Sequence, residues 1–314
     1  MKKNVILAFF VLFSYEIRAQ ESETVYNFLR LPVSAHAAAL GGDNITIDDD
    51  DPTMVFHNPA LVSNVSDRSL NLNYMTYMEG VKVASASFVK ALRQRATWAV
   101  EAQYVDYGSM KQTTAENEVI GKVSAKDIAV GGTFTYALSN KIAGGVTAKF
   151  VSSSLAGFNS IGMAVDLGLN YLNPELGLSV SAVARNLGGQ LKAYEDDFEK
   201  LPFDLQLGVS KRLGESPLRF SVTMTRLHDW DDKFVNHLVF GAEAFLADNI
   251  WIGGGLNPRR SDEMKISDGE TESSHGAGLS FGGGLQLERF KLQLAYGKYH
   301  VSASSLIINI TYTL

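Results

Sequence analysis

The chain has no cysteine among its 314 residues. Without thiols it can form neither disulfides nor thiolate metal sites, so its cysteine usage suits either redox compartment. It also lacks any uninterrupted apolar stretch of the ~18 residues that a membrane-spanning helix requires. Basic residues are outnumbered, since 28 Lys and Arg stand against 34 Asp and Glu. A formal net charge of −6 makes the chain a poor candidate for binding nucleic acid.

Motifs for catalysis and metal binding are equally scarce. The six histidines are scattered, and no pair has metal-ligand spacing. His57 has no accompanying nucleophile motif, and no Ser-His-Asp or paired-carboxylate arrangement emerges. No helical pattern follows the glycine runs at 253–255 and 282–284, so they indicate close backbone approach or a bend rather than a phosphate loop. The sequence therefore predicts a protein that is not an enzyme and carries no metal or cofactor.

The start of the chain reads as a secretory signal peptide. Lys2 and Lys3 form a basic start, an apolar run of nine residues begins at Val5, and Ala19 precedes the expected cleavage point. The apolar run is too short to span a bilayer as a helix. We therefore expect an exported protein from which residues 1–19 are removed.

From Ser69 to the C-terminus, apolar residues alternate with polar ones at the period of a β-strand. Leu70, Leu72 and Tyr74, for example, share one face. Fourteen such blocks can be counted, each near the ~9–11 residues that a tilted strand needs to cross a membrane. They begin near residues 69, 81, 97, 126, 141, 160, 177, 202, 218, 237, 250, 276, 290 and 305. The last block ends the chain at Leu314, which fits a barrel that closes on its first strand.

The connections between the blocks alternate in length. Six are short, and the alternate ones are mostly long and polar, with the hairpin at Glu79-Gly80 as an exception. We expect long loops at Gly108–Ala125, Asn186–Leu201, His228–Asn236 and Pro258–His275. Short turns at one end and long loops at the other are typical of an outer-membrane barrel.

Charge placement favours a barrel over a soluble β-sandwich, which also alternates. A Lys or Arg on the lipid face at mid-membrane costs ~2–4 kcal/mol. The mid-strand charges all fall on the polar face, and we expect them to line the lumen: Glu101, Lys149, Asp166, Arg185, Asp204, Arg219 and Glu243. Four other charges fall at strand ends, near the interfaces: Asp106, Lys211, Arg226 and Lys298. The sequence thus predicts an all-β, transmembrane outer-membrane β-barrel of about fourteen antiparallel strands over residues 69–314.

Residues 20–68 do not alternate, and they are too few for an independent domain of ordinary size. A barrel of fourteen strands has a lumen wider than its own side chains can fill. We therefore expect this segment to fold into the lumen as a hatch, where its polar groups meet charges such as Lys149, Arg185 and Arg219. A disordered periplasmic tail is the alternative. The candidate hatch residues are Asp48, Asp49, Asp50, Asp51, Phe56, His57, Asn58 and Pro59.

Two acidic segments suggest ligands or partners. The carboxylates of residues 48–51 would suit Ca²⁺, but they lack the EF-hand spacing and Pro52 follows at once, which favours solvated or lumen-paired charges. In an expected outer loop, Trp230 is either a partner-binding anchor or part of the aromatic belt at the lipid interface. From position alone, the partner-binding candidates are Trp230, Asp231, Asp232, Arg259 and Arg260.

Several stretches together resemble a known family: "LPVSAHAAALGG" with "FHNPAL", then "LNLNYMTY", then "LPFDLQLGVS". From about residue 24 to its C-terminus, the chain resembles the PorQ-like barrels of the PorV/PorQ family, which belong to the type IX secretion system of Bacteroidetes. That family is similar, more distantly, to the FadL fatty-acid transporters. "FHNPAL" alone is shared loosely across the FadL-like group, and the acidic "DGETESS" is a departure.

The resemblance implies a non-enzymatic outer-membrane subunit with loops at the cell surface. Such a subunit holds a PorZ-like surface protein in an attachment complex with PorU and PorV, where PorU joins secreted cargo to lipopolysaccharide. Outer-membrane lipid and lipopolysaccharide are therefore the further partners to consider. Two other functions stay open. One is a PorV-like shuttle that carries cargo, and the other is a FadL-like transporter of hydrophobic molecules, which the charged lumen face disfavours.

Overall fold

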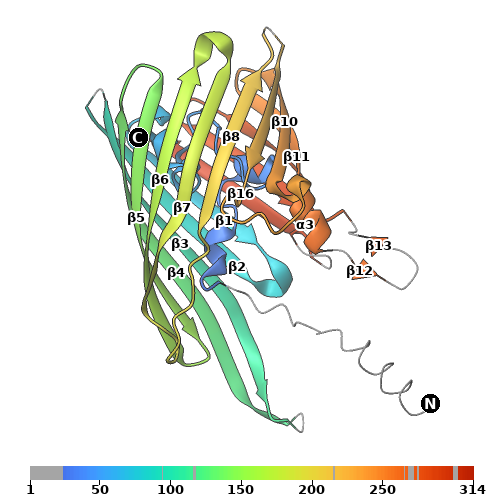
Figure 1. Ribbon diagram of the computed structural model, residues 1–314. Coiled ribbons are helices and arrows are strands. Elements are labelled where there is room, and N and C mark those ends of the chain that lie inside the picture. The colour runs from blue at the N-terminus through green and yellow to red at the C-terminus, as the bar shows by residue number, and fades with distance from the viewer. Residues whose placement is uncertain are drawn as a thin grey trace, which may run out of the picture.

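The computed structural model describes residues 24–93, 95–115, 118–214, 216–264, 266–267, 272–273, 276–299 and 303–314. Its main body is a closed barrel of fourteen antiparallel strands, in which each strand pairs with its neighbours in sequence (Figure 1). The first strand, β1, closes the ring by pairing with the last, β16. The fold class predicted from the alternation is thus confirmed. The predicted signal peptide lies outside the described residues.

The barrel strands begin close to the predicted starts, with one exception. They are β1 Ser69–Thr76, β2 Lys82–Arg93, β3 Ala96–Thr113, β4 Val119–Ala137, β5 Ile142–Leu155, β6 Phe158–Asn173, β7 Leu178–Lys192, β8 Asp204–Arg212, β9 Leu218–Met224, β10 Leu238–Ala247, β11 Ile250–Leu256, β14 Leu279–Gln286, β15 Phe290–Gly297 and β16 Ser305–Thr313. The short β12 (Ile266–Ser267) and β13 (Glu272–Ser273) pair with each other outside the barrel.

The exception is the predicted loop at Gly108–Ala125, which is wrong. β3 continues to Thr113 and β4 begins at Val119, so the two strands together take up most of it and form a projecting ribbon at the bottom of Figure 1. The last rung that β2 shares with β3 is Lys82 opposite Asp106. Beyond that rung, buried and exposed side chains no longer alternate along β3. The alternation of apolar and polar residues by which a strand is recognised in the sequence therefore fades, although the strand continues. The expected loop at Asn186–Leu201 is shortened in the same way, because β7 runs on to Lys192.

The outward face of the ring is apolar and the inward face is polar. Along β4, Ile128, Val130 and Phe134 are exposed on the outside, while Thr133 and Thr135 are buried on the inside. This is the reverse of a soluble sheet, and it is the arrangement that presents a lipid-facing layer around a polar interior. The chain is therefore built as a transmembrane barrel.

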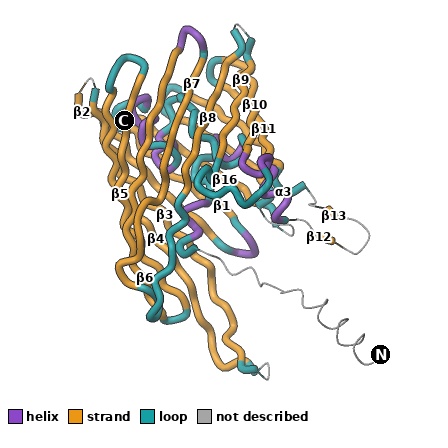
Figure 2. Tube along the Cα trace, viewed as in Figure 1, coloured by secondary structure: helices purple, strands orange, loops and turns teal. Residues whose placement is uncertain are grey.

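The segment from Thr24 to Arg68 lies inside the ring, where Figure 2 shows helices and loops enclosed by strands. We call it the plug. Thr24 forms a bridge to Lys200 at the end that carries the longer loops, and the plug leaves at the opposite end, where β1 begins. Its helices are η1 Asn27–Arg30, α2 Ala35–Ala39, η2 Pro52–Phe56 and η3 Pro59–Asn64. The remaining helices, all in connections, are η4 Met78–Gly80, η5 Pro174–Leu176, η6 Phe234–His237 and α3 Pro258–Glu263. None of the described helices is long and apolar enough to cross a membrane.

Local chemistry explains where the plug helices begin. The Asp51 side chain accepts from the Thr53 amide and Pro52 takes the first helical position, which is the preferred pairing at a helix start. Asn58 repeats the device by accepting from the Ala60 amide, with Pro59 next. The acidic, proline-containing stretch therefore determines where η2 and η3 begin.

Glycines of the wall let the plug approach closely. A Cβ on Gly255 of β11 would overlap the backbone of Gly41, and one on Gly168 of β6 would overlap Asn58. The first glycine belongs to the run at 253–255 and both face the plug. At Gly255 the plug backbone comes close, and at Gly168 the Asn58 side chain comes close, which is the reason for glycine at these places.

Candidate functional site

The plug–wall interface holds a network of ion pairs, and Arg219 of β9 is at its centre. Its Nε donates to Glu243 of β10 at 2.6 Å. Its Nη1 donates to Asp48 at 2.8 Å, and its Nη2 donates to Asp49 at 2.5 Å. One buried guanidinium therefore joins two wall strands to the acidic run of the plug, 171 residues away in sequence.

His36 of helix α2 extends this network. Its Nε2 lies 2.7 Å from the Glu243 carboxylate, and its ring stacks on Trp251 with centroids 3.8 Å apart. Burial by itself lowers the pKa of His36, but the carboxylates of Glu243 and Asp49 outweigh burial and raise it. Burial likewise acts against the charged form of Asp49, yet Arg219 and His36 lower the pKa of that carboxyl to about 2. We call the set His36, Asp48, Asp49, Arg219 and Glu243 the lock.

The other two acids of the run are also occupied. Asp50 pairs with Nζ of Lys291 at 2.6 Å and accepts from Ser66. Asp51 accepts from the amide and hydroxyl of Thr53. Each of the four acids therefore has a local or cross-lumen partner.

A cation is the alternative occupant of this cluster. His36, Asp49 and Glu243 offer ligand atoms within 4.8 Å of one another. However, Arg219 already donates to both carboxylates, and it supplies the positive charge that an ion would bring. The geometry therefore fits an ion-paired lock and does not fit a Ca²⁺ site.

The mid-lumen charges have different partners from those expected. Lys149 does not reach the polar groups of the plug, because its Nζ binds Asp166 at 2.8 Å and Asn186 at 2.6 Å, both on the wall. The Asn186 amide also donates to Asp166, at a bulge of β7 where Asn186 has a φ of 59°. Arg185 does meet the plug, through a 3.1 Å bond from Nη2 to the Leu29 carbonyl.

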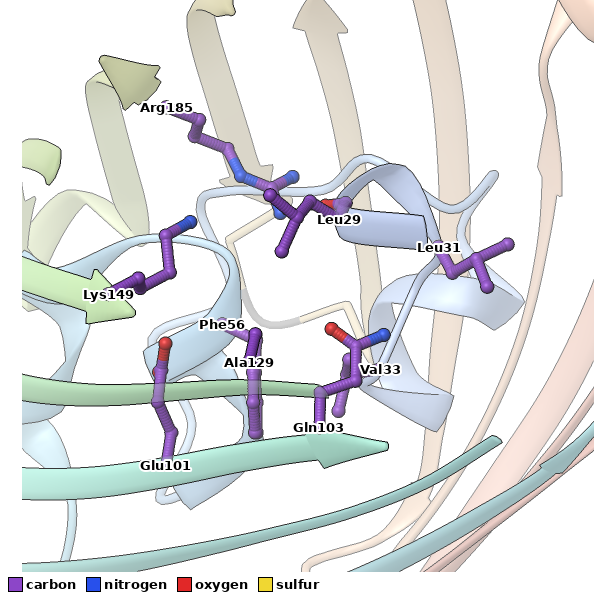
Figure 3. A pocket seen from close by; sticks show the side chains of 9 residues that line it. All are labelled: Leu29, Leu31, Val33, Phe56, Glu101, Gln103, Ala129, Lys149 and Arg185. Carbon is purple, nitrogen blue, oxygen red and sulfur yellow. The ribbon is translucent and has the colours of Figure 1, made fainter. Parts of the chain in front are cut away.

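A small cavity lies between this group and the plug. Figure 3 shows apolar plug side chains facing charged wall side chains across it. Its lining residues are Leu29, Leu31, Val33 and Phe56 from the plug, with Glu101, Gln103, Ala129, Lys149 and Arg185 from the wall. The volume of about 10 Å³ holds roughly one water molecule. This cavity therefore cannot take an organic ligand as it stands.

A second cavity of about 170 Å³ lies beside the lock, towards the short-turn end. Asp49, Asp50 and Lys291 line it together with Phe245 and Trp251. Sites for drug-sized ligands usually measure ~300–1,000 Å³ and are mostly apolar. This cavity is smaller, and charged side chains form part of its lining, so it too provides no apolar route through the lumen.

His57, Asn58 and Phe56 serve packing. His57 is buried, and its Nε2 accepts from the Ser34 amide at 3.4 Å. Burial, with a further contribution from Arg185, lowers the pKa of His57 to about 3. Asn58 caps η3 and donates to the Ile45 carbonyl. These contacts give the "FHNPAL" stretch a role in plug structure.

The outer-loop candidates divide into two groups. Trp230 is 53% exposed and stacks in parallel with Phe234, while its Nε1 donates to the Leu227 carbonyl. Asp231 is exposed beside it.

The second group of outer-loop candidates has partners within the chain. Arg259 contacts Asp232 at 3.6 Å and Glu263 at 2.7 Å, and Arg260 covers the Tyr299 ring at 4.1 Å and reaches the Gly41 carbonyl. Asp204 lies at the rim, where it accepts from Gln206 and the Arg226 amide.

Sequence reasoning missed His36, Trp251 and Lys291. Lys291 shares the polar face of its strand with Gln293, so the period-two register could have found it. No local signal pairs His36 with Trp251, because their contact depends on how the plug is seated.

No family model matches the chain, and no curated protein matches it. Solved structures do match. A FadL homologue of Pseudomonas aeruginosa has a TM-score of 0.56 at 9% identity, over 89% of this chain and 98% of that one. The Pseudomonas putida toluene transporter TodX has a TM-score of 0.56 at 14% identity, over 90% and 97%. The CymD monoaromatic hydrocarbon channel has 0.58 at 14%, over 92% and 98%. At these identities the likeness defines the fold: this chain is a FadL-like, outer-membrane type of barrel.

Proposed function

We propose that the protein is a non-enzymatic outer-membrane subunit of the type IX secretion system, which holds a PorZ-like surface protein in the attachment complex with PorU and PorV. The observation that carries this proposal is the locked plug. Arg219 joins the plug to two wall strands, and the wall glycines admit the plug backbone. A barrel filled in this way is suited to presenting a surface, with its loops as the working part.

The lumen chemistry supports a role outside the lumen. The two cavities beside the plug are small and lined by charge, with Glu101 and Arg185 in one and Asp49 and Lys291 in the other. The exposed Trp230–Phe234 pair in the loop between β9 and β10 offers an aromatic contact of the kind that anchors protein partners.

The test is isolation of the tagged protein from native outer membranes in mild detergent, followed by mass spectrometry of the proteins retained. Recovery of a PorZ-like protein with PorU and PorV would support the attachment role. Trp230→Ala with Phe234→Ala should then reduce that recovery, while Phe198→Ala, in the loop between β7 and β8, serves as the exposed aromatic control. Recovery of the barrel alone at cellular abundance would count against the proposal.

The second candidate is transport of hydrophobic molecules, and the likeness to TodX and CymD supports it more directly than it supports the first. It requires the plug to yield a passage that is closed in this conformation. Uptake of a labelled fatty acid or of toluene that depends on this protein would favour it. Stable retention of secreted cargo domains by the purified barrel would instead favour a PorV-like shuttle.

A further inference from the structure

The outward face of the β3–β4 ribbon carries a row of lysines just beyond the edge of the apolar layer. Along β4, the outward side chains run from Val130 and Ile128 to Lys126 and then Lys122, and all four are exposed. The step from Ile128 to Lys126 spans about 7 Å of strand at ~3.4 Å per residue. Lys126 therefore stands at the edge of the hydrocarbon layer, and Lys122 stands four residues further along the same face, with Ser124 between them.

The neighbouring strands add two more ammonium groups to the same face. Lys82 of β2 is opposite Asp106 of β3, which is in turn opposite Lys126. Further along, Lys111 of β3 lies directly opposite Lys122. Residues opposite each other in an antiparallel pair share a face, so the four lysines form one outward surface. We call this surface the lysine rim.

The lysine rim has an excess of positive charge, because four ammonium groups share its face with the Asp106 carboxylate. Like charges directly opposite each other destabilise a strand pair, yet Lys111 and Lys122 are placed in this way. Among the described residues, none of the four ammonium groups forms an ion pair, and the Asp106 carboxylate accepts from the Gly108 amide. An external anion between the lysines would remove the repulsion.

We propose that the lysine rim binds the phosphate groups of phosphorylated outer-leaflet lipids. The place of the rim selects this class of ligand. Its side chains lie on the same face as Ile128 and Val130, which meet the hydrocarbon, so whatever stands against them is continuous with the lipid layer. A phosphate above an acyl chain meets both requirements. The inference rests on the proposed outer-membrane placement, with the longer loops outside, and it is independent of any protein partner.

The test uses the full mature chain in detergent and bisphosphorylated lipid A as the probe, with native mass spectrometry to measure bound lipid. The test variant replaces Lys82, Lys111, Lys122 and Lys126 by Gln. The matched control replaces four exposed basic residues near the short-turn end: Lys90, Arg95, Lys141 and Arg289. Heat-modifiable migration on gels shows that each variant is folded.

We expect the test variant to bind lipid A at least ten-fold more weakly, and the control to bind it as the parent does. Removing the lipid phosphates should abolish the difference between parent and test variant. Raising the salt concentration should weaken binding to the parent, because exposed charges are screened. Equal binding by parent and test variant, or equal loss in the control, would overturn the proposal. Unchanged lipid A binding by the test variant would assign the rim to an acidic protein partner instead if the same variant, isolated from native outer membranes, no longer recovered a surface protein. Because the assay contains no partner protein, its result is independent of the attachment role.

Discussion

At the scale of single residues, the lock depends on complete pairing. Taking a charge out of water costs several kcal/mol, and a buried pair recovers this only when its hydrogen bonds are satisfied. Arg219 uses Nε, Nη1 and Nη2 on three carboxylates, and Glu243 accepts from both Arg219 and His36. Removing Arg219 leaves the Glu243 carboxylate buried without that partner, beside the partly exposed Asp48 and Asp49.

We therefore predict that Arg219→Ala releases the acidic run of the plug. Breaking a buried ion pair from one side typically costs about 3–5 kcal/mol, because an uncompensated charge remains. Hydrogen exchange of residues 44–58 in detergent should become faster, while exchange in β5 and β6 stays as in the parent. Arg289→Ala, an exposed change near the short-turn end, is the control. Unchanged exchange at Asp48 and Asp49 would show that the lock does not hold the plug.

His57 provides a pH test of plug stability. Its folded pKa of about 3 lies below the ordinary value of ~6.5, so as the pH falls the unfolded state takes up the proton first. The stabilising contribution is present above pH ~6.5 and is lost as the pH falls towards 3, by up to about 1.4 kcal/mol per pH unit. Exchange around residues 52–62, corrected for the intrinsic rate at each pH, should accelerate between pH 6.5 and 4.

His57→Gln should flatten this pH dependence, because it removes the titrating group. His228→Gln, at an exposed position in the loop between β9 and β10, is the control and should keep the dependence. A profile in which the parent and His57→Gln follow the same curve would assign the pH dependence to groups other than His57.

At the scale of elements, glycines of the wall strands allow the plug to pack closely against the wall. Helix α2 lies against β11, β14 and β15, where glycine runs leave the room that it needs. Neighbouring glycines of one strand lie on opposite faces of the wall. Substituting one on each face therefore separates an effect on plug packing from an effect on the strand itself.

We predict that Gly255→Ala destabilises the seated plug by about 1–3 kcal/mol, the usual cost of overpacking. Its Cβ would overlap the backbone of Gly41. Gly254→Ala is the matched control, since the atom nearest to its Cβ is the Ser280 carbonyl oxygen at 3.4 Å. Protease sensitivity of the plug in the folded barrel is the readout. Equal sensitivity of the two variants would argue against close seating.

At the scale of the whole molecule, the barrel is a closed ring around a filled interior. An empty ring of this size would hold a wide aqueous lumen. We predict that the parent protein in a planar bilayer shows no stable, porin-like conductance, because the plug occupies the lumen. Arg219→Ala should show transient openings. Large, steady pores in the parent would contradict the sealed lumen and would favour the transport function.

The sequence predicted strands best where one face of the strand meets lipid and is apolar, while the other face meets the lumen and is polar. In β6, Met163, Val165 and Leu167 alternate with Asp166, and the strand was found to within a few residues. The β3–β4 ribbon projects beyond the apolar layer, so neither of its faces meets hydrocarbon. The alternation therefore fades, and the prediction of a loop at residues 108–125 was wrong. Composition led us to expect polar groups of residues 20–68 near Arg219, but not which acid pairs with it, since a capping Asp51 and an ion-paired Asp49 look alike in sequence.

The sequence by itself determined the closed barrel, its strand number and the polar inner face, because side-chain period and solvent preference are local properties of a strand. Only the tertiary structure decided that Arg219 meets Asp48 and Asp49, that Lys149 stays with Asp166, and that Gly255 receives the plug. Those pairings join residues far apart in the chain. They depend on the register of a closed ring and on the depth at which the plug is seated, neither of which any single stretch of sequence contains.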